Sequence, residues 1–195
     1  MKNEQLKELL LQSLEHETGG VKVYETALEC AVDGDLKKEW TRYYEQTQKH
    51  VRVLEDTLEQ LGIERETTPG CEIIRDLGAA LVAAMKKAAA SGKPEAAQLV
   101  ACECVVLAET KDHLDWELIG EAAKKLKGDE RKALQAAYDE IEDEEDEHLY
   151  HTKGWCRELW LDSLGIPAVL PPPEERKHVK TAIGASRAEQ ARKSM

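Results

Sequence analysis

Apolar residues recur every three or four positions along most of this chain, the spacing that places them on one face of an α-helix. The pattern breaks at short segments rich in Gly, Pro and Asp, which are typical helix ends. No stretch shows the strict alternation expected of a half-buried strand. The sequence therefore predicts an all-α fold with five helices, over residues 5–32, 36–61, 72–90, 94–126 and 130–164.

The lengths of the connections predict how these helices are arranged. The short breaks at Asp33-Gly34-Asp35 and Lys127-Gly128-Asp129 favour two antiparallel hairpins. Residues 72–90 have a narrower apolar face and lie between the two hairpins, where some four-helix bundles have a long crossover. We expect a four-helix bundle with an extra helix in the crossover between its second and third helices.

The end of the chain differs from the rest. Pro171-Pro172-Pro173 favours an extended backbone, and the basic segment after it has too few apolar residues to fold alone. We expect a helical domain over residues 1–166 and an extended tail over residues 167–195, either solvated or packed against a partner subunit or another protein.

Composition and charge exclude several classes of protein. The 195 residues include no Phe and only six Pro, which favours an all-helical fold over a sheet protein. The net charge of -12 argues against binding to nucleic acid or to an anionic membrane surface. The five cysteines form no Cys-x-x-Cys motif, so neither a disulfide framework nor a zinc ribbon is expected. Without an apparent signal peptide or membrane span, a cytoplasmic protein is expected.

The most unusual stretch is residues 139–147, in which eight of nine residues are acidic. The stripe of apolar residues nevertheless continues through it, and both Glu145 and His148 fall on this inward face. A buried carboxylate is unfavourable unless a cation meets it. Glu-x-x-His is also the ligand pair that helices supply in di-metal carboxylate bundles. In so acidic a run, the motif could equally belong to a solvated charged face.

The other three long helices also place polar residues on their inward faces, near mid-helix. These residues are Glu17, His50 and Glu109, with Asp112 and His113 as further candidates beside Glu109. In antiparallel hairpins, mid-helix positions meet at one level. Carboxylate oxygens together with imidazole nitrogens suit iron or manganese, and zinc less specifically. The alternative is that the acids pair with Lys or Arg and that the histidines are ordinary core residues.

The residues that carry these patterns resemble the ferritin-like superfamily, most closely its rubrerythrin branch. The resemblance covers about residues 5–164 and rests on the order and spacing of the candidate ligands. It implies that Glu17 and Glu109 are single-Glu ligands, that Glu145 and His148 form a complete pair, and that His50 is the histidine of the second helix. Asp112 stands where rubrerythrins have an extra carboxylate.

Two departures from that family bear on function. Thr47 stands where the second helix would carry the Glu of its Glu-x-x-His pair, so the site is expected to be asymmetric, to hold one metal tightly, or to recruit Asp112, His113 or Glu45 instead. The chain also lacks a rubredoxin-like cysteine module, so electrons would come from a separate donor. The resemblance implies an oxidoreductase with two iron or manganese ions per chain, acting on peroxide or dioxygen or oxidising Fe(II). The alternatives are an iron-binding, storage or assembly protein and a bundle that has lost its metal; a homodimer is expected.

Overall fold

The computed structural model describes residues 3–169, and all regular secondary structure in this range is α-helical, as the sequence predicted. The chain forms five helices. Their bounds are α1 Asn3–Cys30, α2 Gly34–Gln60, α3 Pro69–Ala89, α4 Pro94–Ala123 and α5 Gly128–Ser163. These bounds differ from the predicted ranges by only a few residues, because the Gly and Pro positions that end the apolar pattern also end the helices.

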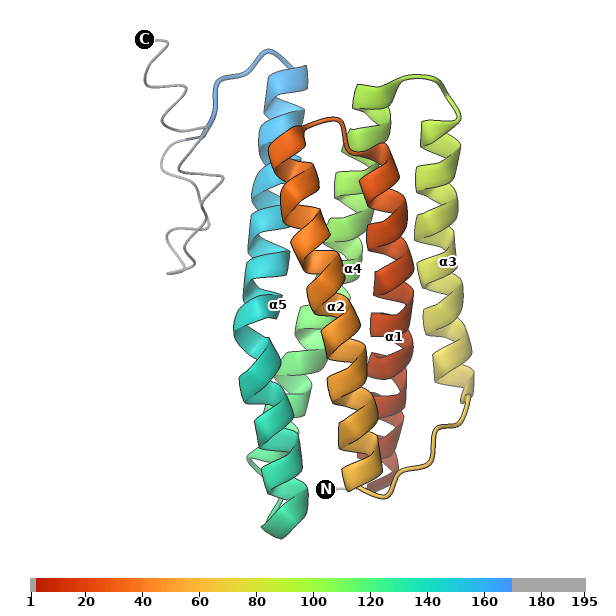
Figure 1. Cartoon of the computed structure of the whole chain (residues 1–195), viewed down its shortest axis with the longest axis vertical. Coiled ribbons are helices and arrows are strands. Elements are labelled where there is room, and N and C mark those ends of the chain that lie inside the picture. Colours follow the sequence, from red (N-terminus) through yellow and green to blue (C-terminus); the bar gives the residue numbers. More distant parts are fainter. Residues whose placement is uncertain (1–2, 170–195) are drawn as a thin grey trace.

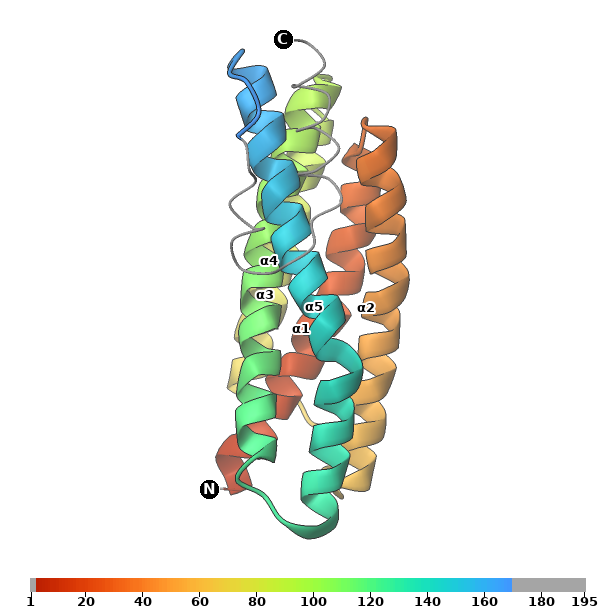
Figure 2. The ribbon, with the colours of Figure 1, turned by 90° about the vertical axis from the view of Figure 1, so that its left-hand side faces the viewer.

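The helices lie side by side along the long axis of the molecule (Figure 1). Helices α1, α3 and α5 run in one direction, and α2 and α4 run in the other. Helix α1 packs against α2 and α4, and α5 packs against the same two helices, so α1, α2, α4 and α5 form a four-membered group. Helix α3 packs on the outside of this group, against α1 and α4, and carries the chain from the end of α2 to the start of α4 (Figure 2).

Local chemistry sets the helix starts. The Asp33 carboxylate accepts hydrogen bonds from the backbone N–H groups of Asp35 and Leu36, at 2.9 and 3.0 Å, and so caps α2. Thr68 caps α3 by accepting from the Cys71 N–H, and Pro69 follows as the first helical residue. Gly62, just beyond α2, has a φ of 65°, which glycine adopts without steric strain.

The apolar core is divided into two parts. One part contains Tyr24, Trp40, Tyr43 and Trp155, and the other contains Leu14, Leu54, Trp116 and Ile141. On each of α1, α2, α4 and α5, the buried residues of one part are followed by buried polar residues and then by those of the other part. A polar layer therefore crosses the middle of an otherwise apolar bundle.

The predicted division into a bundle and a tail falls close to the end of the described chain. Helix α5 ends at Ser163, and residues 164–169 follow without helical structure. Apart from residues 167–169, the tail expected over residues 167–195 lies outside the described residues. Across residues 3–169, no helix combines the length and apolar character that crossing a membrane requires.

Candidate metal centre

The polar layer is built from six ionisable side chains supplied by four helices. Helix α1 supplies one, α2 one, α4 two and α5 two, and each is 4% exposed or less. The six residues are Glu17, His50, Glu109, Asp112, Glu145 and His148. All six were expected from the sequence, and the structure brings them together because each lies about one helical turn from a buried apolar residue of its own helix.

The two imidazoles have the same orientation relative to the layer. Nε2 of His50 lies 2.8 Å from Oε2 of Glu144, and Nε2 of His148 lies 3.1 Å from the side-chain oxygen of Gln46. Both Nδ1 atoms face the carboxylates. Since an Nε2–H that donates to an oxygen leaves a lone pair on Nδ1, this tautomer directs two ligand nitrogens into the layer.

Glu145 is the central carboxylate of the layer. Its Oε1 lies 2.9 Å from Nδ1 of His50 and 3.4 Å from Nδ1 of His148. Oε1 of Glu17 is 3.3 Å from the same atom of His50 and also accepts a 2.9 Å hydrogen bond from the indole N–H of Trp116. Oε2 of Glu109 lies 3.6 Å from Nδ1 of His148.

The layer contains a concentration of polar atoms that make no hydrogen bond. They include one oxygen each of Glu17, Glu109 and Asp112, both oxygens of Glu145, and Nδ1 of both histidines. Buried polar atoms without partners cost free energy, and the large majority of buried side-chain polar atoms in native proteins are satisfied. Atoms of this kind gathered at one point are the donor set that a bound cation would satisfy.

The charges in the layer support the same conclusion. Among the ion pairs of the described chain, no Lys or Arg pairs with Glu17, Glu109, Asp112 or Glu145; Lys49 pairs with Glu144, and Lys111 with Asp115. The sequence-based alternative, in which Lys or Arg neutralises these acids, is therefore not what the structure shows. Two divalent cations would balance four carboxylates with both imidazoles neutral.

Burial and mutual contact shift the pKa values strongly. Burial, followed by repulsion from Glu17 and Glu145, raises the pKa of Asp112 well above its usual range. Burial opposes ionisation of Glu145, but the imidazoles of His148 and His50, whose Nδ1 atoms face its Oε1, lower its pKa to about 2. Burial also opposes protonation of His148, yet Glu109 and Glu145 raise its pKa to about 9. Without a metal, the layer therefore holds protons in place of cations.

The ligand atoms fall into two overlapping groups that could each hold an ion. One group is His50, Glu145 and His148, and the other is Glu17, Asp112 and Glu145; within each, the ligand atoms lie within 4.8 Å of one another. Glu145 belongs to both groups, as a carboxylate that bridges two ions would. Oxygen and nitrogen donors of this kind could hold a metal ion, and no thiolate is among them.

Two residues that the sequence offered as additional ligands, His113 and Glu45, do not lie in the polar layer. His113 points elsewhere: its Nε2 lies 2.7 Å from Oδ1 of Asp146, near the surface. Glu45 is exposed. Thr47 is buried beside the layer, but its hydroxyl donates to the backbone carbonyl of Tyr43. Asp112 is the residue that adds a carboxylate to the layer.

The surroundings of the layer include residues that sequence reasoning missed. Gln46 and Glu144 orient the imidazoles, yet each looks like an ordinary polar residue on a helix. Tyr43, rather than its neighbour Tyr44, contacts His148, with ring centroids 4.2 Å apart. The signal that could have found Gln46 and Glu144 is helical phase, since each flanks an inward position, but side-chain reach across helices is not readable from one sequence.

A second buried polar cluster lies one turn further along α5. The Glu39 carboxylate accepts hydrogen bonds from Tyr43 at 2.6 Å and Trp155 at 2.7 Å, and it pairs with Nδ1 of His151 at 2.5 Å. Both of its oxygens are therefore satisfied, and this cluster links α2 to α5 without presenting a ligand set.

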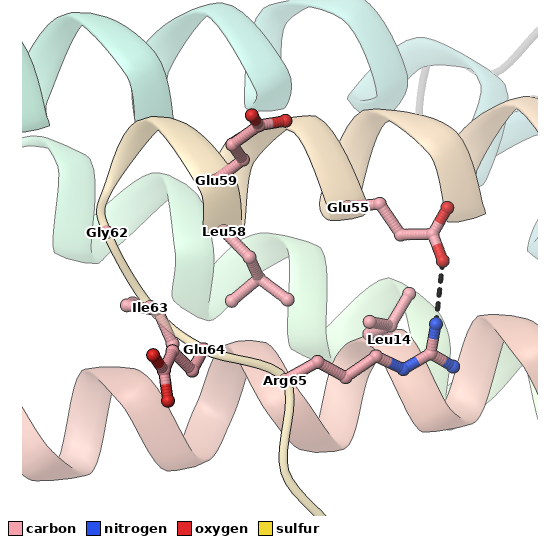
Figure 3. Close-up of a pocket in the computed structure, with 8 residues that line it drawn as sticks. All are labelled: Leu14, Glu55, Leu58, Glu59, Gly62, Ile63, Glu64 and Arg65. Atoms are coloured by element: carbon pink, nitrogen blue, oxygen red, sulfur yellow. Dashed lines mark hydrogen bonds and ion pairs between the residues drawn. The ribbon is translucent and has the colours of Figure 1, made fainter.

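A hollow of about 550 Å³ lies beside the C-terminal end of α2 and the residues that follow it (Figure 3). Leu14 and Leu58 form its floor, and Arg65 crosses its rim to pair with Glu55 at 2.7 Å. None of the six residues of the polar layer lines it. This hollow is therefore separate from the candidate metal centre.

Comparison with known proteins adds no assignment, because no family model, curated protein or solved structure matches the chain.

Proposed function

We propose that this chain is a ferritin-like protein of rubrerythrin type, which binds two iron or manganese ions in the polar layer and acts as an oxidoreductase on peroxide or dioxygen or on Fe(II). The single observation that carries the proposal is the set of unpartnered Nδ1 and carboxylate oxygen atoms that converge on Glu145. Support also comes from the order of the helices, in which α3 spans the crossover between two hairpins.

Each residue of the polar layer would have a distinct role at such a centre. Glu145 would bridge the two ions, His50 and His148 would bind through Nδ1, and Glu17, Glu109 and Asp112 would complete the coordination. Glu144 and Gln46 would fix the orientations of the His50 and His148 imidazoles. The two parts of the apolar core would exclude bulk water. When bound, iron or manganese would supply the redox steps that amino-acid side chains lack.

Asp112 would supply the carboxylate that the second helix lacks. Thr47 cannot supply a carboxylate, and its hydroxyl is bonded to its own helix. Asp112 brings a fourth carboxylate from α4 instead, with ligand atoms close to those of Glu17 and Glu145. The expected centre is therefore asymmetric but retains enough charge for two divalent ions.

The test is metal analysis of protein from iron- and manganese-replete cells, with the double variant Glu145→Ala/His148→Ala beside it. We expect two metals per chain in the wild type and fewer than one in the double variant. The matched control is Asp143→Ala/His113→Ala, which removes an exposed acid and the histidine that points away from the layer. Wild-type protein without stoichiometric metal, or a control that loses metal equally, would refute the proposal.

The burial of all six ligands favours a second candidate, an iron-binding protein with little turnover, because a closed layer restricts substrate access. Two assays on metal-loaded protein separate these functions. Peroxide consumption with a supplied electron donor supports the oxidoreductase. Net retention of iron without peroxide consumption supports the second candidate.

A further inference from the structure

An apolar hollow of about 260 Å³ lies between α1, α3 and α4, on the outer side of α1 from the polar layer. Its wall consists almost wholly of aliphatic residues and glycine, among them Val23, Ile74 and Leu81. A cavity of about 150 Å³ already accepts benzene in another protein, so this one has room for a larger apolar body.

Two leucines at the rim of the hollow are largely exposed to solvent. Leu77 of α3 is 59% exposed and Leu107 of α4 is 62% exposed, and both line the hollow. An apolar ligand in the hollow would cover them, and each square ångström of apolar surface removed from water contributes about 25 cal/mol.

Glycines allow the backbones of α1 and α3 to approach closely beside the hollow, and Gly19 leaves open space there. A Cβ built on Gly78 would lie 3.8 Å from Cα of Gly19, so the two backbones are close there. A Cβ built on Gly19 would meet nothing within 4 Å. A side chain at Gly19 therefore has open space to occupy, and glycine in the middle of a helix is otherwise unfavourable by about 1 kcal/mol.

The ionisable groups that line the hollow are basic. They are Lys111 and His16, and no acidic residue lines it, although the chain carries a net charge of -12. Lys111 pairs with Asp115 through its ammonium group, which leaves two further N–H donors. His16 donates from Nε2 to the carbonyl of Ala108 at 3.0 Å. An apolar body with an anionic head complements this lining.

We propose that this hollow is a binding site for a small amphipathic carboxylate, either a medium-chain fatty acid or an aryl carboxylate. The apolar body lies in the open space beside Gly19 and against the two rim leucines, and the carboxylate lies at Lys111. This inference does not depend on the proposed metal centre, because none of the six polar-layer residues lines the hollow.

The experiment is calorimetric titration of the purified chain with butanoate, hexanoate, octanoate, phenylacetate and 1-octanol. We expect affinity to rise about threefold to fourfold with each added methylene. Octanoate is expected to bind at least tenfold more tightly than 1-octanol. Tighter binding of octanoate than of phenylacetate would indicate a fatty acid, and the reverse would indicate an aryl carboxylate. Affinity that is independent of chain length, or equal affinity for octanol and octanoate, would overturn the proposal.

Two variants locate the site. Gly19→Leu fills the open space and is expected to weaken octanoate binding at least tenfold, whereas Gly34→Leu, at another open glycine outside the hollow, leaves it unchanged. Lys111→Met/Asp115→Asn removes the ion pair as a unit and is expected to reduce octanoate affinity to that of octanol. Circular dichroism confirms folding of each variant. Octanoate binding to folded Gly19→Leu protein with wild-type affinity would contradict the proposed location of the site.

A carboxylate could also bind directly to a metal, so the titration is repeated with Glu145→Ala/His148→Ala protein. We expect unchanged octanoate binding in this variant, and loss of binding would refute the hollow as the site. Metal content of the Gly19→Leu protein is expected to equal that of the wild type. Failure of the ligand site and failure of the metal centre are therefore distinguishable.

Discussion

At the scale of single residues, the orientation of two imidazoles decides what the polar layer can bind. Glu144 and Gln46 each accept from Nε2, and this leaves both Nδ1 atoms for the centre of the layer. Residues that orient a metal-binding histidine typically change metal affinity by about 10- to 100-fold when they are removed.

Gln46→Leu is therefore expected to weaken metal binding by about 10- to 100-fold while the protein stays folded. The measurement is competition with a metal-buffering chelator, followed by absorbance. Gln48→Leu is the control, because Gln48 reaches only the backbone carbonyl of Tyr44, at 3.5 Å. Equal affinities for the two variants would show that Gln46 does not position His148.

The pH dependence of the metal-free protein follows from His148 and Asp112. Folding raises the pKa of His148 from 6.5 to about 9, so its stabilisation is fully present below pH 6.5 and is lost as the pH rises through about 9. The raised pKa of Asp112 acts in the same direction, because ionising a buried acid destabilises the folded state.

We expect the metal-free protein to lose about 1 to 3 kcal/mol of stability between pH 6.5 and pH 9. Thermal unfolding of chelator-treated protein across this range is the measurement. His148→Gln should flatten the dependence, since the residue that exchanges its proton is gone. Stability that stays constant or increases with pH would contradict these pKa shifts.

At the scale of helices, contacts at glycine control how closely neighbours approach. A Cβ built on Gly120 of α4 would lie 2.5 Å from the ring of Tyr138 on α5, inside van der Waals contact. These two helices supply four of the six residues of the polar layer, so their separation sets the geometry of the centre.

Gly120→Ala is expected to destabilise the protein by about 1 to 3 kcal/mol, because the Tyr138 ring must move. Gly19→Ala, also within a helix but with open space around it, is expected to stabilise by up to about 1 kcal/mol. Urea unfolding of both variants measures the difference. A Gly120→Ala protein as stable as the wild type would show that the two helices separate without cost.

At the scale of the whole molecule, the polar layer joins α1, α2, α4 and α5 through six buried ionisable side chains. Buried polar atoms without hydrogen-bond partners there oppose folding in the absence of metal. A ligand that binds only the folded state stabilises it, by about 2.7 kcal/mol at a concentration of 100 Kd.

Addition of Mn²⁺ or anaerobic Fe²⁺ is therefore expected to raise the thermal midpoint of the metal-free protein by several degrees. The Glu145→Ala/His148→Ala protein should show no such rise. Differential scanning calorimetry is the measurement. An equal rise in both proteins would place the stabilising ions elsewhere on this acidic chain.

The sequence by itself determined the helices and the inward residues. Apolar spacing of three and four fixed which face of each helix is buried, and Gly and Pro fixed where helices end, because both effects act within a few residues. Glu17, His50, Glu109, Glu145 and His148 could be predicted since each interrupts a buried stripe. Their capacity to hold a metal remains a prediction.

Only the tertiary structure decided which neighbours those residues meet. His113 and Asp112 are adjacent in sequence, yet one turns to Asp146 and the other joins the layer. The roles of Gln46 and Glu144, and the hollow between α1, α3 and α4, also depend on contacts between helices. The physical reason is that helical phase gives the direction of a side chain, whereas its partners depend on how far and at what level the next helix lies.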